Sequence, residues 1–147
     1  MAVRPSVWVL RTVGTVHTVA VFAQPVFAGV YLSGDFDGLG MHRTGADLVT
    51  SLCLLQLVVA GVVWARLRRS WPFWASLALM AAESAQYVAG TEGALWLHIP
   101  LGVFTVVAAT LLFAALWLRP LAPRGATPAA PTATPVVGAP RTERADV

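Results

Sequence analysis

The chain has 147 residues, of which 57% are hydrophobic and only 12% carry a charge. An ordinary soluble domain has about 25% charged residues, so this composition excludes that class and favours a membrane protein. The formal net charge is +3 and all ten basic residues are arginines. Because these arginines flank apolar runs, they indicate orientation in a membrane and not nucleic-acid binding.

Four apolar runs predict four transmembrane helices, since about 20 residues cross a hydrocarbon layer of ~30 Å. None shows the two-residue alternation of a barrel strand. We therefore expect an all-α integral membrane protein whose helices form an up-down bundle, or equivalently two tandem hairpins. The domain covers 12–118, with helices at about 12–33, 45–65, 71–90 and 95–118.

Segments of different character flank this domain. Residues 1–11 are predicted to be a cytoplasmic N-terminus, and 119–147 a disordered cytoplasmic tail rich in Pro, Ala and Thr. The first apolar run has an alternative reading as a secretory signal cleaved after Val21-Phe22-Ala23, although it is longer than the usual apolar core of a signal.

The arginines set the expected orientation. Nine of the ten lie before the first helix, between the second and third, or after the fourth; only Arg43 lies on the other side. The positive-inside rule then places both termini in the cytoplasm of a multi-pass inner (plasma) membrane protein.

The first hairpin carries several polar residues inside the apolar runs. His17 shares a helix face with Gln24 and is interpreted as a packing or hydrogen-bonding residue, since no histidine partner is expected at its depth. Below His42, helical spacing leads to Ala46, Cys53 and Gln56. A single cysteine excludes an internal disulfide and a covalently attached haem, so Cys53 is expected to be a small buried hydrophobe.

Glu83 is the one acidic residue deep within a predicted span. Together with Gln86 it forms a polar stripe that should face inward. A carboxylate there could relay protons, bind a quinone or balance a cationic ligand. The alternative is a protonated carboxyl group that is hydrogen-bonded across the bundle to Gln24 or Gln56.

A faint repeat relates the hairpins: Ala23-Gln24 with Ala28-Gly29 matches Ala85-Gln86 with Ala89-Gly90, and a histidine follows each. A true repeat would bring His42 and His98 to similar depth, facing each other near the outer surface. Each has a small residue one turn below, Ala46 and Gly102, which would leave room for a flat ring. Two such histidines could bind the iron of a b-type haem; simple helix packing is the alternative.

His42-Arg43 at a helix start, and His98 followed by Pro100-Leu101-Gly102, resemble one half of the haem A synthase fold and other four-helix membrane cytochromes. The stretches HRTGADLV and LHIPLGV are similar to small uncharacterised four-span bacterial membrane proteins. Haem A synthase resembles two such units and draws on an acidic outer loop, whereas this chain has one unit. The resemblance therefore implies haem contact more than synthase chemistry.

These observations predict a membrane protein that binds haem b, or a quinone, near the outer face for electron transfer. The alternative is a non-catalytic accessory subunit or small-solute permease component without a cofactor. No catalytic residue is predicted and the expectation leans against an enzyme. The expected partners are the lipid bilayer and another membrane protein or a second copy, and no nucleic acid.

Overall fold

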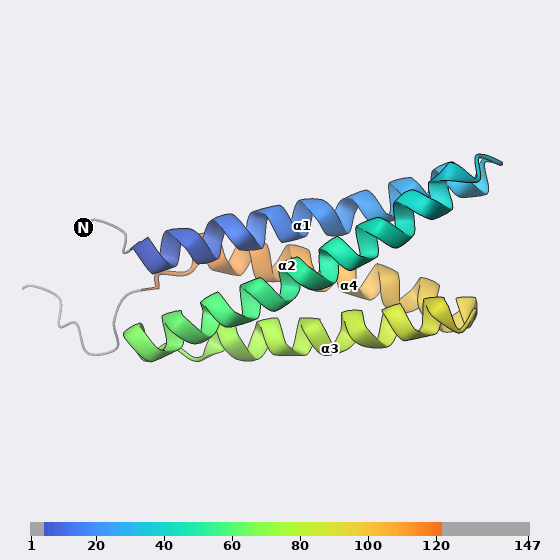
Figure 1. The fold of residues 1–147 in the computed structure, drawn as a ribbon. Coiled ribbons are helices and arrows are strands. Elements are labelled where there is room, and N and C mark those ends of the chain that lie inside the picture. The colour runs from blue at the N-terminus through green and yellow to red at the C-terminus, as the bar shows by residue number, and fades with distance from the viewer. Residues whose placement is uncertain (1–4, 122–147) are drawn as a thin grey trace, which may run out of the picture.

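A computed structural model describes residues 5–121, and every regular element in this part of the chain is an α-helix. The chain runs up and down four times, so that each helix is antiparallel to the one before it (Figure 1). The helices are α1 (Pro5–Leu32), α2 (Asp37–Leu67), α3 (Trp71–Thr91) and α4 (Leu95–Leu118). The predicted tail from residue 122 onward lies outside the described residues.

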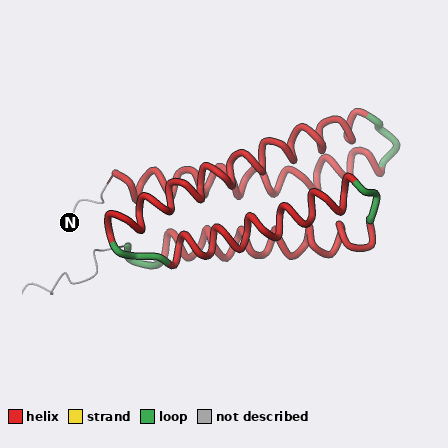
Figure 2. Tube along the Cα trace, turned by 60° about the horizontal axis from the view of Figure 1, so that its bottom comes forward, coloured by secondary structure: helices red, strands yellow, loops and turns green. Residues whose placement is uncertain are grey.

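Two of the helices begin earlier than the sequence predicts. α1 starts at Pro5 and α2 at Asp37, so His42 lies inside α2 and not before it. Short turns join the helices (Figure 2). In the first turn Gly34 has a φ of 96°, and the Asp35 carboxylate accepts a hydrogen bond from the Asp37 backbone N–H at 3.0 Å. A carboxylate at this place also suits the positive end of the helix dipole, which explains the early start of α2.

The beginning of α2 packs tightly against the end of α1. At Gly38, a Cβ atom would lie 2.9 Å from the Phe27 carbonyl oxygen and would also meet the Tyr31 backbone nitrogen. These are backbone atoms, which cannot move aside as a flexible side chain can. A residue without a side chain is therefore required where the two helices diverge from their turn.

The four helices pack in a ring in which α1 contacts α2 and α4, and α3 contacts the same two helices. α1 and α3 are diagonal partners, as are α2 and α4, and their backbones are not in direct contact. Contacts between α1 and α3, or between α2 and α4, are therefore made by side chains that reach across the centre of the ring. The apolar core includes Leu10, Val21, Cys53, Ala60, Val63, Leu67, Leu79, Ala109, Leu112 and Leu116.

Three of the helices, α1, α2 and α4, are long and apolar enough to cross a membrane, whereas α3 is not among them. Many of their large apolar side chains point outward and are more than half exposed, including Val19, Val58, Val103 and Leu111. In a soluble protein such a surface would be unfavourable. The described part of the chain thus has the surface expected of a membrane protein.

Candidate functional site

His42 from α2 and His98 from α4 meet across one diagonal of the ring. Their ring centroids are 5.9 Å apart and the ring planes are inclined by 82°. Both side chains are half-buried. The predicted encounter of the two histidines is thus present, near the end of the molecule where the short turns 33–36 and 92–94 lie.

Each of these histidines is fixed by a backbone carbonyl group of the preceding helix. His42 Nδ1 lies 3.1 Å from the Gln24 carbonyl oxygen, and His98 Nδ1 lies 2.9 Å from the Gln86 carbonyl oxygen. A carbonyl oxygen only accepts, so in both rings Nδ1 carries the proton and donates it. In a neutral imidazole this leaves the Nε2 lone pair available to a metal or to another donor.

The equivalence of the two hairpins extends to the glutamine side chains. The Gln24 side chain packs on Gly45 so closely that a Cβ atom there would collide with its Nε2. A Cβ atom at Gly102 would similarly lie 3.1 Å from Gln86 Nε2. The sequence suggested that Ala46 and Gly102 leave room for a flat ring. In the structure the space at Gly102 is taken by the Gln86 side chain, and on α2 the glycine that accommodates a glutamine side chain is Gly45.

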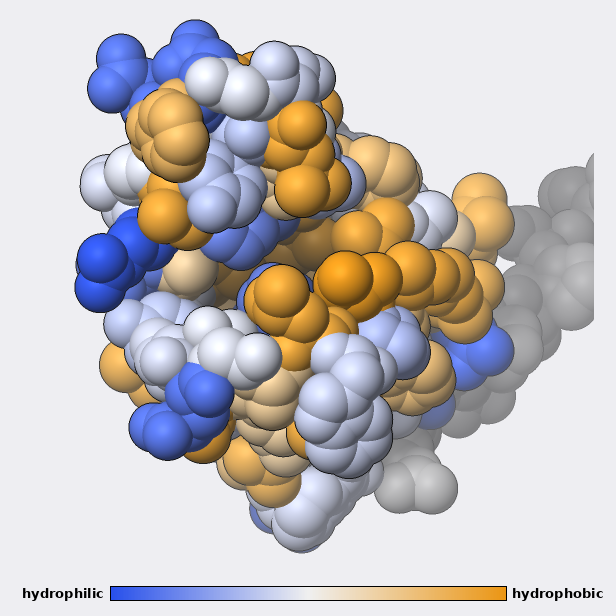
Figure 3. All heavy atoms as spheres, turned by 90° about the vertical axis from the view of Figure 1, so that its right-hand side faces the viewer, coloured by the Kyte–Doolittle hydropathy of each residue, from blue (hydrophilic) through white to orange (hydrophobic). Residues whose placement is uncertain are grey.

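A cavity of about 220 Å³ extends from the two histidines into the interior. Figure 3 views the molecule from this end and shows a hollow between the helices, bordered on one side by hydrophobic residues. Gly102 lines the cavity, whereas Ala46 does not. The polar residues of its wall are His42, His98, Gln24, Gln86, Glu83 and Thr105, and the apolar ones include Val21, Val49, Ile99, Val103 and Val106.

A second polar group occupies the centre of the molecule, across the other diagonal. His17 Nε2 of α1 lies 3.1 Å from Glu83 Oε1 of α3, and the two residues are only 1% and 5% exposed. His17 Nδ1 donates to Gln56 Oε1 at 3.1 Å, and Gln56 Nε2 donates to Ser76 Oγ at 3.1 Å. A hydrogen-bonded chain thus joins α1, α2 and α3.

Cys53 belongs to this central group. It is completely buried, and its Sγ, His17 Nε2 or Nδ1 and a Glu83 oxygen all lie within 4.8 Å of one another. From the sequence, His17 was expected to pack or form a hydrogen bond, and Cys53 to be a small buried hydrophobe. Glu83 was expected to relay protons, bind a quinone or balance a cationic ligand, or else to bond to Gln24 or Gln56. In the structure the nearest basic partner of Glu83 is His17.

Counting residues from the start of each helix could have predicted that His17 and Glu83 lie at the same depth. His17 and Glu83 are each the twelfth residue after the first residue of their helix, Pro5 and Trp71. Both helices begin at the same end of the molecule (Figure 1). Starting the first helix at residue 12 hid the match, because it placed His17 near a helix end.

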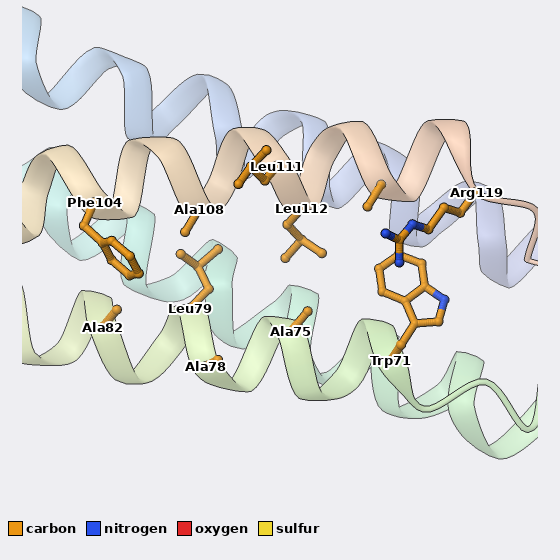
Figure 4. Close-up of a pocket in the computed structure, with 11 residues that line it drawn as sticks. Trp71, Ala75, Ala78, Leu79, Ala82, Phe104, Ala108, Leu111, Leu112 and Arg119 are labelled. Carbon is orange, nitrogen blue, oxygen red and sulfur yellow. The ribbon is translucent and has the colours of Figure 1, made fainter.

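A second hollow between α3 and α4 differs in character. It has a volume of about 350 Å³ and is lined mainly by alanine, leucine and aromatic side chains, with Arg119 at one end above the Trp71 ring (Figure 4). The arginine carbon lies 5.6 Å from the ring centroid, a favourable cation–π distance. This hollow contains no pair of chemically reactive side chains and resembles a groove between helices.

Together these features define an all-helical protein with membrane-compatible helices and two interior polar groups on crossed diagonals. No protein-family model, curated protein or solved structure matches the chain. The resemblance to the haem A synthase unit therefore stays a prediction.

Proposed function

We propose that the protein is a four-span membrane protein that binds a b-type haem between His42 and His98, near the outer face, and serves in electron transfer. The observation that carries this proposal is the pair of imidazoles 5.9 Å apart, each with Nδ1 held by an equivalent carbonyl group. Metal-binding histidines are commonly fixed by just such a bond to the other ring nitrogen.

The donor set fits a haem iron. His42 and His98 would hold the iron, because their ring centroids lie 5.9 Å apart and each Nδ1 is occupied by a carbonyl group, which leaves each Nε2 available to a metal. The cavity of about 220 Å³ is smaller than the roughly 300–1,000 Å³ that enclose a drug-sized ligand. A haem would therefore be enclosed only in part by this cavity.

When bound, haem would supply one-electron redox chemistry. The protein's contribution is to hold both imidazoles in one tautomer and to surround them with apolar side chains such as Val21 and Val103. Burial and hydrogen bonds to the ligating histidines are the means by which a protein tunes a redox potential. The Gln24 and Gln86 carbonyl groups occupy that position here.

In this proposal α3 also crosses the membrane. Its 21 residues correspond to about 31 Å at 1.5 Å per residue, and it packs between α2 and α4. Two of its polar residues, Ser76 and Glu83, are buried against the other helices and do not face lipid. Arginine placement then sets both termini in the cytoplasm of an inner (plasma) membrane.

The test is the visible spectrum of the full chain purified in mild detergent, oxidised and then reduced with dithionite. We expect the sharp Soret and α bands of a low-spin haem with two axial imidazoles. Either His42→Ala or His98→Ala should abolish these bands, and added free imidazole should restore them by filling the vacated place. The matched control is Ser51→Ala, an exposed position of α2 whose hydroxyl group donates only to the Asp47 carbonyl group of its own helix, and it should leave the spectrum unchanged.

A colourless protein after haem supplementation would overturn the proposal. So would a spectrum that survives the loss of both His42 and His98. Either result would favour the other class of protein, in which these polar side chains only hold membrane helices together.

A further inference from the structure

In the central group, the arrangement of hydrogen bonds leaves two acceptor atoms of His17 and Glu83 facing each other, so a proton or a metal ion must lie between them. Gln56 Nε2 donates to Ser76, so the amide oxygen of Gln56 faces His17 and accepts from its Nδ1–H. The remaining nitrogen, Nε2, then presents a lone pair to Glu83 Oε1 only 3.1 Å away. Two acceptors at this distance repel each other unless a cation lies between them.

Apart from the Cys53 thiol, which lies beside the Glu83 carboxyl group, the atoms concerned have no other partner among the described residues. Neither His17 Nε2 nor either oxygen of Glu83 has a hydrogen-bond partner of acceptable geometry among the described residues. An ionised or polar group buried to this degree is costly when left unsatisfied. Since only 5% of Glu83 is exposed, hydration by solvent does not compensate for the missing hydrogen bonds of its carboxyl group.

We propose that His17, Cys53 and Glu83 form a binding site for a divalent transition metal of the zinc class, at the centre of the protein. Their ligand atoms lie within 4.8 Å of one another. Ligands around a tetrahedral ion with bonds of about 2.0–2.3 Å are roughly 3.3–3.8 Å apart, so side-chain shifts of about 1 Å would bring the three atoms to that spacing. A thiolate and an imidazole select against magnesium and calcium, which prefer oxygen ligands. This site is separate from the His42 and His98 pair and does not depend on haem binding.

Charge balance supports the same assignment. A divalent ion with one thiolate, one carboxylate and one neutral imidazole has no net charge, and neutrality greatly reduces the cost of burial in an apolar interior. Gln56 acts as the outer partner that holds His17 in the metal-binding tautomer, as is usual for ligating histidines. Three protein ligands leave one position open, a feature of zinc sites that also bind water or substrate.

The cavity gives the site a route of access. Glu83 is the ligand that borders the cavity, whose wall also carries Gln24 and the two outer histidines. Gln24 Oε1 is a further buried oxygen without a hydrogen-bond partner among the described residues. A metal ion or a water molecule on the open position would reach the site from this side.

X-ray absorption of the zinc-loaded protein tests the proposal most directly. The full chain is stripped with chelator, reloaded with zinc and desalted, in the native form and in the His42→Ala/His98→Ala background. We expect one zinc per chain with one sulfur neighbour at about 2.3 Å in both proteins. Because the chain has a single cysteine, that sulfur can only be Cys53 Sγ.

Variants provide the second arm of the test. Cys53→Ser should remove the sulfur neighbour, and the near-isosteric Glu83→Gln should abolish stoichiometric binding. Gln56→Leu keeps all three ligands and should weaken zinc binding about 10–100-fold. The matched control is Ser84→Ala, an exposed position one residue from Glu83, which should bind zinc as the native chain does.

Zinc bound without sulfur, or no stoichiometric zinc in the native chain, would overturn the assignment and leave a proton shared between His17 and Glu83. These readings come from the native protein and hold even if a variant fails to fold. They also differ from failure of the haem proposal, which is read from visible bands that depend on His42 and His98.

Discussion

The two histidine environments differ in what faces the free ring nitrogen. His42 and His98 face each other beside a cavity, whereas His17 faces a carboxylate in a closed core. In all three the other nitrogen, Nδ1, is fixed by an amide oxygen, from the backbone in two and from a side chain in one. The same tautomer control therefore serves two different kinds of site.

Ser76→Ala tests how much the central chain contributes to stability. Ser76 is 1% exposed and accepts from Gln56 Nε2, so its loss leaves a buried N–H without an acceptor. We expect the free energy of unfolding to fall by about 1–3 kcal/mol, measured by denaturant unfolding in detergent with chelator present.

Ser84→Ala is the matched control on the same helix. Ser84 is exposed and its hydroxyl donates only to the Met80 carbonyl within the helix, so the change should stay within about 0.5 kcal/mol. Equal unfolding midpoints for the two variants would show that the Gln56 contact contributes nothing to stability.

At the level of helices, Gly38→Ala tests the close approach of α2 to α1. The added methyl group would meet the Phe27 carbonyl oxygen and the Tyr31 backbone, and it can be accommodated only if the helices separate. Overpacking of this kind typically costs about 1–3 kcal/mol. We expect a lower midpoint in thermal unfolding followed by circular dichroism.

Gly40→Ala provides the comparison, because no atom lies within 4 Å of the added Cβ. The better helix propensity of alanine should raise stability, by up to about 1 kcal/mol. If both glycine variants shift the midpoint in the same direction, the close approach of α1 and α2 is not what Gly38 provides.

The helices and one of the two contacts across the centre, that of His42 with His98, were predictable from the sequence. Long apolar runs predict α4 at residues 95–118, as observed, since lipid-facing segments are apolar throughout. The start of α2 depends on the turn contact of Asp35, which hydropathy does not register, and α1 continues past Arg11 to Pro5, beyond the apolar run that predicted it. His42 and His98 could be paired because each follows a turn at the same end of the molecule. His17 and Glu83 were not paired, because the first helix was expected to start at residue 12 and not at Pro5, which hid that both residues lie twelve positions after a helix start.

At the scale of the whole molecule, two diagonals cross between four helices. His17 and Glu83 connect α1 with α3, while His42 and His98 connect α2 with α4. Neither pair of helices has backbone contact, so these side chains form the direct links across the centre. Both proposed sites therefore depend on all four helices being assembled.

The proposed orientation is tested by cysteine labelling with a membrane-impermeant maleimide in intact cells, in a Cys53→Ser background. Asp37→Cys, at the start of α2, should react from outside. Arg68→Cys, just after α2, should react only after the membrane is permeabilised. The reverse pattern would contradict the assignment of both termini to the cytoplasm.

The buried pairing of Glu83 has a consequence for how the chain is made. In the proposed topology α3 is the least apolar span, and a charged group at mid-membrane costs about 2.5–3.5 kcal/mol on insertion. Its partner His17 of α1, and Gln56 of α2, which holds both His17 and Ser76 of α3, leave the ribosome before it does. α3 should accordingly enter the bilayer against helices already in place, and separated from them by truncation it should be released from the translocon into the aqueous phase.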